Sequence, residues 1–501
     1  MKRQHPYALL RYTTKNFWLL LIPLVRGLVT LSKDTDFQSW LSGAEWDILV
    51  IVIMLSAAVI RWYFTRFEFT DSEVVLRTGI IGVIEERIPY DCVSVVSSGT
   101  NILLKKIGAV RINIDTDAPT GVPNSSDILL IVSPSDRARL FNLLNEKASG
   151  KYKGLSGMNY VYKVSKKSLV FFSVFFSSAL SGTILLGTFF TQGGKILGEQ
   201  LENYIMSAVT DVTSDIYEAA QRFAANVPFA AVVITLVIAV GFIISFVSNL
   251  LMHLNFTISR RASTILVSGG FFNKRQYFIN SRRVNYTDMQ QNLLMKLFGV
   301  TSVNVSCTGY GKQKREIPVF VPICSIKRIY DGKSRTELLS VMKHLLPEFS
   351  LSETFITPNI TYIMRFIAIP IVLIFAIMIL GFAGIIFFQE WYSLISFITI
   401  LLEIPAVWLL LVKSCAYCTN GINIVQKNVC IKYCKGYRFH TVTVPLERVA
   451  YIDVKQTVFQ RMNKSCDVVV HTNSEYRGSH RVRGMPLAEV NELLKERALQ
   501  K

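Results

Sequence analysis

Asn101-Ile-Leu-Leu-Lys-Lys-Ile-Gly108 and Asn292-Leu-Leu-Met-Lys-Leu-Phe-Gly299 match position for position, although they lie far apart in the chain. A third copy, Gln456-Thr-Val-Phe-Gln-Arg-Met-Asn463, ends in asparagine where the other two end in glycine. Both residue types tolerate a left-handed backbone, so each block predicts a short segment that a turn closes. The chain therefore contains an internal repeat, and this repeat decides the fold.

The same signals surround each of the three blocks. A segment with proline or asparagine at its second position comes before the block, and a strand of alternating polarity comes after it. The preceding segments are Ile88-Pro89-Tyr-Asp-Cys-Val93, Ile279-Asn280-Ser-Arg-Arg-Val284 and Val444-Pro445-Leu-Glu-Arg-Val449. The following strands are expected at 110–114, 300–305 and 467–471.

An amphipathic helix is expected to end each copy. Several short strands capped by one helix describe a bent antiparallel sheet or a partly open barrel. We interpret each copy as a β-rich domain of the pleckstrin-homology-like (PH-like) type. The apolar helix positions are Leu140, Phe141 and Leu144 in the first copy, Leu338, Met342 and Leu345 in the second, and Val490, Leu493 and Leu494 in the third.

Six apolar stretches, arranged as three pairs, alternate with these domains. The chain has 51% hydrophobic residues, more than a typical soluble protein, and a transmembrane helix needs about 20 apolar residues. The expected fold is a mixed membrane protein with six transmembrane α-helices in three pairs and three cytoplasmic PH-like domains, each capped by a C-terminal helix. The expected spans are 17–31, 46–64, 166–190, 228–252, 363–388 and 392–413.

These expectations divide the chain into six parts. The transmembrane pairs, each with the segment before it, occupy 1–64, 151–252 and 351–413. The three PH-like domains occupy 65–150, 253–350 and 414–501.

Charge predicts which side of the membrane the domains occupy. The segments before the first and third spans are rich in lysine and arginine, whereas the loops inside the pairs are acidic on balance. Basic residues resist translocation, so both termini and all three domains are expected in the cytoplasm, at the cell membrane. The acidic loop 191–227 is expected outside, with an amphipathic helix. Topology thus accounts for much of the net charge of +19.

Four short stretches carry a resemblance to a known family: His5-Pro6, Leu9-Leu10-Arg11, the run from Leu19 to Leu28, and Ile88-Pro89-Tyr-Asp. Through them the sequence resembles the YdbT-like family of bacterial membrane proteins. The resemblance implies bacterial PH-like domains repeated behind transmembrane pairs over essentially the whole chain. Cys92, where the third copy has Arg448, and Asn280, where the other copies have proline, depart from the pattern.

We expect no catalytic residue, cofactor or metal. The six histidines form no His-Glu-x-x-His motif, and Asp331-Gly-Lys-Ser334 lacks the earlier glycine of a phosphate loop. The spacing of Cys415-x-x-Cys418 and Cys430-x-x-x-Cys434 would suit zinc, but the other copies do not repeat these thiols. All eight cysteines lie outside the expected outer loops, which suits a reducing compartment.

Arg26 and Glu403 fall inside predicted spans, where an unpaired charge costs about 3 kcal/mol. One interpretation is that they pair, or that they line a polar path for a transported solute. The other is that Arg26 reaches the membrane surface and Glu403 faces the helix bundle as a packing residue. The sequence leaves both open.

Lys105, Lys106, Lys296 and Arg461 occupy the repeated blocks, beside apolar side chains. A basic and apolar segment next to a bilayer suits contact with a partner or with anionic lipid, at about 1 kcal/mol per basic residue. Alternatively, each block is an ordinary amphipathic turn whose apolar side completes the domain core.

Two functions remain after these exclusions. The leading hypothesis is a non-enzymatic membrane scaffold or adaptor that presents three PH-like domains to protein partners, in an assembly for envelope protection or stress response. The alternative is a transporter or lipid-handling protein that uses Arg26 and Glu403. Membrane lipids and a membrane or peripheral protein are the expected partners. Nucleic acid is not expected, because the basic residues concentrate where topology requires them.

Overall fold

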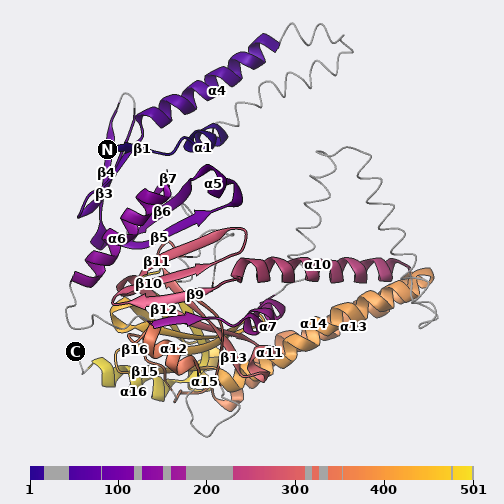
Figure 1. The fold of residues 1–501 in the computed structure, drawn as a ribbon. Coiled ribbons are helices and arrows are strands. Elements are labelled where there is room, and N and C mark those ends of the chain that lie inside the picture. The colour runs from indigo at the N-terminus through magenta and orange to yellow at the C-terminus, as the bar shows by residue number, and fades with distance from the viewer. Residues whose placement is uncertain are drawn as a thin grey trace.

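The computed structural model describes residues 1–15, 44–79, 82–117, 127–150, 160–176, 229–310, 319–326, 337–352, 354–474 and 478–498. Stacked β-sheets form a body, and long helices protrude from one side of it (Figure 1). Outside the repeated domains the helices are α1 (Ala8–Lys15), α4 (Ala44–Phe64), α7 (Lys166–Phe176), α10 (Phe229–His253), η4 (Ile360–Tyr362), α13 (Ile363–Phe387), η5 (Gln389–Trp391) and α14 (Tyr392–Thr419).

Each repeat consists of two antiparallel sheets that a single 3-10 turn connects. Domain 1 contains β2 (Arg66–Phe69), β3 (Glu73–Thr78), β4 (Ile84–Pro89), η2 (Tyr90–Cys92), β5 (Val93–Thr100), α5 (Ile102–Ile107), β6 (Val110–Thr116), β7 (Ile128–Val132) and α6 (Pro134–Gly150). Domain 2 contains β9 (Thr257–Arg261), β10 (Thr264–Gly269), β11 (Lys274–Asn280), η3 (Ser281–Arg283), β12 (Val284–Asn292), α11 (Leu293–Leu297), β13 (Val300–Cys307), β14 (Val321–Ser325) and α12 (Glu337–Leu345). Domain 3 contains β15 (Gly421–Val425), β16 (Asn428–Lys435), β17 (Arg438–Pro445), η6 (Leu446–Arg448), β18 (Val449–Lys455), α15 (Val458–Met462), β19 (Ser465–Thr472), β20 (Ser479–Pro486) and α16 (Leu487–Ala498).

The domains are joined through shared sheets. The second sheet of domain 1 continues into the first sheet of domain 2 in the order β7-β6-β5-β11-β10-β9, and β14-β13-β12-β17-β16-β15 joins domain 2 to domain 3. The register is the same in both: Val96 lies opposite Phe278 in joint 1, and the equivalent Thr287 lies opposite Thr443 in joint 2. The sequence predicted β-rich domains but not this pairing between one domain and the next. The backbone groups at the edge of β5 and β12 are paired by the next domain instead.

A short segment before each helical pair joins the domain that follows the pair. β1 (Lys2–Arg3) pairs with β2, and β8 (Tyr160–Lys163) pairs with β9. Before the third pair, Ile356 forms a single bridge with Ile422 of β15. The structural repeat therefore begins before the helices, which the sequence did not reveal.

The hydrophobic cores also cross joint 1. Val95 of domain 1 packs in the core of domain 2, and Phe278 of domain 2 packs in the core of domain 1. Burying one such side chain contributes about 1.5–3 kcal/mol, so the joint is part of the folded core. The apolar positions predicted for the terminal helices are confirmed, since seven of them are buried and Leu493 and Leu494 are partly buried.

The repeated blocks form the short helices α5, α11 and α15. Gly108 and Gly299 after the first two adopt φ +72° and +63°, as their left-handed turns require. In the third copy Asn463 has φ −93°, and the left-handed residue is Lys464 with φ +46°. The prediction was therefore wrong by one residue there.

Within the described residues, two helices are long and apolar enough to cross a membrane, rather than the six expected. They are Ile360–Phe387 and Leu394–Thr419, and most of their surface is exposed in the protein. Ile48–Phe64 and Val237–His253 are apolar but shorter. The expected span 17–31 and the loop 191–227 lie outside the described residues, as does most of 166–190, and the domain limits stay predictions.

Gly309 gives a test of joint 1. Its φ is +89°, and a Cβ atom there would clash with the Asp115 side chain of domain 1. Gly309→Ala is therefore expected to destabilise the protein by about 2 kcal/mol through backbone strain and overpacking. Thermal unfolding in detergent measures the effect, with Gly99→Ala as the control, because a Cβ at Gly99 would meet open space. Equal unfolding midpoints for the two variants would contradict this account of the joint.

Candidate functional site

The short helices α5, α11 and α15 lie on the side of the body from which the long helices protrude (Figure 1). Leu104 of α5 packs in one cluster with Ala58 and Trp62 of α4. On α11, Phe298 at the C-cap contacts the ring of Phe175 on α7. In α15, the Gln460 side chain donates a 2.7 Å hydrogen bond to the hydroxyl of Tyr362, just before α13. Each block therefore stands beside the base of a helical pair.

Most apolar side chains of these helices are exposed. One residue of each helix is buried, namely Leu104, Met295 and Gln460. Our interpretation of the blocks as turns that complete the core is therefore wrong for most of their apolar residues. The exposed ones are Ile102, Leu103 and Ile107 on α5, Leu294, Leu297 and Phe298 on or beside α11, and Val458, Phe459 and Met462 on α15.

The predicted basic residues occupy equivalent helices but different surroundings. Lys105 and Lys106 are exposed in the last turn of α5, and Arg461 is exposed on α15. Lys296 is half-buried, with its Nζ 4.5 Å from the centre of the Phe439 ring. Burial lowers the pKa of Lys296. We name these residues and the exposed apolar ones the three tips.

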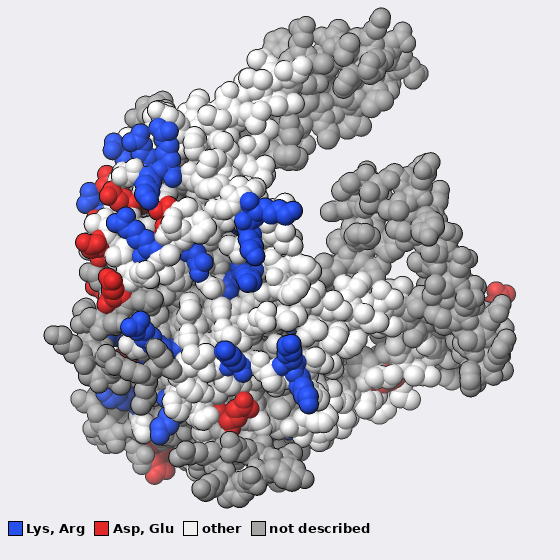
Figure 2. Space-filling model, viewed as in Figure 1, with Lys and Arg blue, Asp and Glu red and all other residues white. Residues whose placement is uncertain are grey.

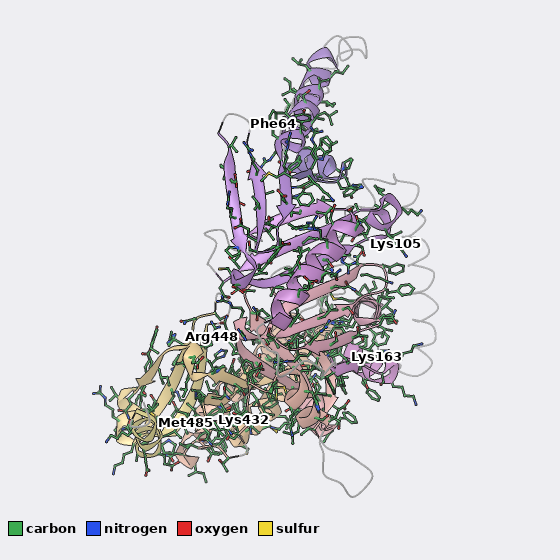
Figure 3. The ribbon with its side chains drawn as sticks, turned by 60° about the vertical axis from the view of Figure 1, so that its left-hand side comes forward. Phe64, Lys105, Lys163, Lys432, Arg448 and Met485 are labelled. Carbon is green, nitrogen blue, oxygen red and sulfur yellow. The ribbon has the colours of Figure 1, made fainter. Side chains whose placement is uncertain are left out.

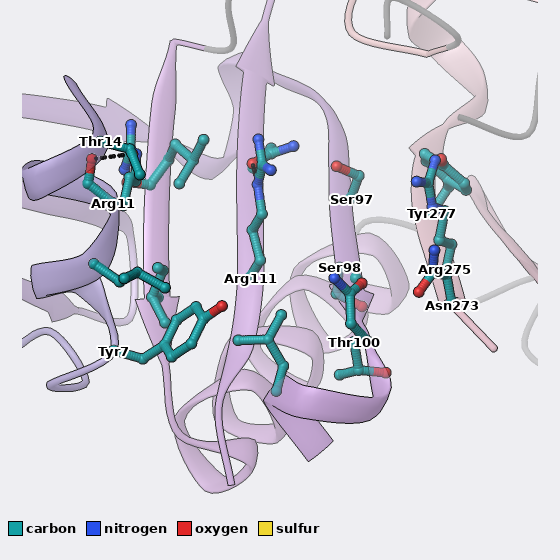
Figure 4. Close-up of a pocket in the computed structure, with 17 residues that line it drawn as sticks. Tyr7, Arg11, Thr14, Ser97, Ser98, Thr100, Arg111, Asn273, Arg275 and Tyr277 are labelled. Carbon is teal, nitrogen blue, oxygen red and sulfur yellow. Dashed lines mark hydrogen bonds between the residues drawn. The ribbon is translucent and has the colours of Figure 1, made fainter. Parts of the chain in front are cut away.

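A basic cleft of about 560 Å³ opens at joint 1, beside the first tip (Figure 4). Arg111 of β6 lies opposite Gly99 of β5, and Gly99 lies opposite Arg275 of β11. The two arginines thus stand about 10 Å apart on one face of the sheet, with no side chain between them. Arg11 of α1 lines the same cleft and donates a 3.0 Å hydrogen bond to the carbonyl of Leu129.

Three arginines gather positive charge in the cleft. Among its described lining residues, none is an aspartate or glutamate. The pKa of Arg11 is lowered, chiefly by burial and further by the charges of Arg111 and Arg61. Guanidinium groups bind phosphate through paired, charge-assisted hydrogen bonds, so the cleft suits a phosphate-bearing anion. The equivalent row in joint 2 is Ser302, Gln290 and His440, which carries no arginine.

Three segments of the chain match the family described as "Bacterial PH domain", at residues 24–148, 210–335 and 365–500. This chain belongs to that family. It is also similar to the UPF0699 transmembrane protein YdbT of Bacillus subtilis (strain 168), with 20% identity over 323 residues. The match covers 61% of this chain and 61% of that relative, and no solved structure matches. The YdbT-like resemblance is confirmed, and the protein is a membrane protein with repeated bacterial PH domains.

Two arginine side chains also connect consecutive bacterial PH domains, and we call them the latch arginines. Arg283 at the end of η3 donates a 2.8 Å hydrogen bond to the carbonyl of Asp91, the middle residue of η2. Arg448 at the end of η6 donates a 2.6 Å hydrogen bond to the carbonyl of Arg282, the middle residue of η3. In domain 1 the same position holds Cys92, which is exposed. At joint 1, domain 1 contributes the accepting carbonyl of Asp91 and not the arginine.

The intramembrane candidates are only partly described. Glu403 lies on α14, and its buried Oε1 has no hydrogen-bond partner among the described residues. Arg26, its proposed partner, lies outside them. The described residues contain no group of three or more His, Cys, Asp or Glu side chains that could bind a metal. Of the four thiols weighed for zinc, Cys415 and Cys434 pack in one apolar cluster, Cys430 is buried in β16, and Cys418 is exposed.

A phosphate test follows from the cleft. Inorganic phosphate is expected to raise the unfolding midpoint of the detergent-solubilised protein above its value in chloride of equal ionic strength, because bound ligand stabilises the folded state. A phosphate concentration of ten times its dissociation constant is expected to stabilise the folded state by about 1.4 kcal/mol. Arg111→Gln should lose most of this increase, and so should Gly99→Leu, which fills the hollow and keeps the charges.

The matched control for that test is Arg77→Gln, at an exposed position of β3 outside the cleft. Each variant is compared with its own midpoint in chloride, so a change in basal stability does not enter the result. A phosphate effect of the same size in Arg111→Gln and Arg77→Gln would refute the site.

Proposed function

We propose that the protein is a non-enzymatic scaffold of the cytoplasmic membrane, whose three bacterial PH domains form one continuous body that binds proteins and rests on anionic lipid. The observation that carries the proposal is the pair of sheet joints that share one register. Domains joined through shared sheets and shared cores present their surfaces at fixed spacing and orientation. Such a body suits the assembly of partners, whereas independently tethered domains would not fix their geometry.

The strand pairing supports a hairpin topology for each helical pair. Lys2 and Phe67, which flank the first expected pair, lie opposite each other in one sheet, and Tyr160 and Arg260 do the same around the second. The chain must therefore return to the side from which it left. The basic flanking residues favour the cytoplasm for both termini, and in this topology all three domains would lie there as well.

The three tips support contact with the lipid headgroups. Exposed apolar residues next to lysine or arginine, beside the base of a membrane helix, have the composition of segments that enter the interface. In Figure 2 the blue and red side chains lie mainly on the body, whereas the described parts of the protruding helices are nearly all white. The basic cleft next to the first tip would then accept the phosphate of an anionic lipid.

A fluorescent label tests the tips. With Cys92 and Cys418 replaced by serine, the variant Phe459→Cys carries an environment-sensitive dye in nanodiscs. The dye is expected to shift to the blue in bilayers that contain phosphatidylglycerol, because the third tip then enters the interface. The control is Glu447→Cys on η6, which directly follows the C-terminal end of β17. A dye at this position is expected to show no shift. Equal spectra at the two positions would refute the lipid contact.

One observation favours transport as a second candidate function. A buried carboxylate oxygen without a partner, such as Oε1 of Glu403, is costly and is often found where a membrane protein binds a solute or moves a proton. If Arg26 is its partner, the two single changes will not be additive in their effect on thermal stability.

Crosslinked purification from native membranes, with proteins and lipids both identified, separates the two candidates. The scaffold predicts a stoichiometric protein partner that Glu403→Gln leaves in place. Transport predicts a specific solute or lipid that Glu403→Gln removes, with no stoichiometric protein. The second result would overturn the scaffold.

A further inference from the structure

We infer that the free edge of β18 binds the edge strand of a bacterial PH domain on a separate polypeptide, in the register of joints 1 and 2. The inference rests on the proposed scaffold function and names the class of partner. β18 is the third copy of β5 and β12, and each of those strands pairs with the last strand of the next domain's first sheet. In the described structure β18 has a neighbour on one side alone, β19.

The exposure of β18 shows what the joint normally covers. Tyr286 and Met289 of β12 are 6% and 5% exposed beneath joint 2. Their equivalents on β18, Tyr451 and Val454, are 55% and 37% exposed. An unpaired strand edge with exposed apolar side chains is a template for strand addition. The third domain therefore keeps an acceptor surface that the first two domains use.

Polar groups of joint 2 are repeated on β18. Asp288 of β12 is buried, and its Oδ2 lies 2.9 Å from Nδ1 of His440 on the incoming strand. The equivalent residue is Asp453, whose side chain is 33% exposed and faces Lys455 and His471 of its own domain. Glu447, exposed in the middle of η6, occupies the position whose carbonyl accepts the latch arginine in the two joints. An arginine of the partner would contact both the backbone carbonyl and the side-chain carboxylate of Glu447.

A second copy of this chain fits less well than another protein. In the described structure the strand equivalent to β11 and β17 that has an unpaired edge is β4, at one end of the sheet β1-β2-β3-β4. Domain 1 has Cys92 in place of the latch arginine and Ile84 where the incoming strands have Arg275 and His440. In the shared register Glu86 would also lie directly opposite Asp453, and like charges across strands repel. The partner therefore carries an edge strand, a side-chain donor for Asp453 and an arginine just after the strand.

Figure 3 shows the setting of this edge, with Arg448 beside the junction of domains 2 and 3 and Met485 in the outer part of domain 3. The two unpaired edges differ in their residues. β4 lacks the polar residue and the following arginine of the incoming strands, whereas β18 keeps the aspartate of an acceptor strand.

Photocrosslinking in native membranes tests the inference with the full chain. Benzoylphenylalanine replaces Tyr451, and in a matched control it replaces Tyr286, which joint 2 buries. The control is expected to form an adduct within the chain. The Tyr451 position is expected to form an adduct with a different polypeptide, at a peptide that reads as a strand followed within a few residues by arginine. Glu447→Arg should lower that adduct at least fivefold, whereas Glu492→Arg on α16 should leave it unchanged.

Three outcomes would overturn the inference: no intermolecular adduct at Tyr451, an adduct with β4 of a second copy, or an adduct that Glu447→Arg does not weaken. Its failure is distinct from that of the scaffold function. A stoichiometric partner that crosslinks elsewhere on the body would keep the scaffold and reject this edge.

Discussion

Backbone hydrogen bonding between neighbouring domains is the constraint on which the rest of the structure depends. An edge strand must pair its N–H and C=O groups, leave them to water or be covered. Here β5 and β12 pair with the first sheet of the following domain, and the surrounding side chains follow that choice. Core residues cross joint 1, arginines close over the 3-10 turns, and the cleft at Gly99 exists because three strands of two domains lie in one sheet.

Much of the domain fold could be predicted from the sequence, because local patterns encode it. The repeated blocks, the strands around them and the buried positions of the terminal helices follow from turn chemistry and periodicity. The joints could not be predicted, since pairing between β11 and β5 joins residues that are far apart and leaves no mark in either strand alone. The strands before the helical pairs were missed for the same reason, and β1 is only two residues long.

The candidate sites show the same limit. Lys105, Lys296 and Arg461 were found because they belong to the repeat, but their exposure to solvent or burial against Phe439 depends on tertiary neighbours. Arg111 and Arg275 were missed because each is unremarkable in its own strand. A sequence signal existed only for the latch arginines: Cys92 stands in the first copy where both later copies have arginine, which points to a contact that the first copy does not make.

The strands that precede the helical pairs have a consequence for biosynthesis. Lys2 and Arg3 are synthesised before their partners Phe67 and Arg66, and α4 is made in between. The first sheet can therefore be completed only after α4 has been made and the chain has returned to the body. In the same way β8 is made before β9, with α7 and α10 in between. Completion of these sheets is thus a late step in synthesis, although their outer strands are made early.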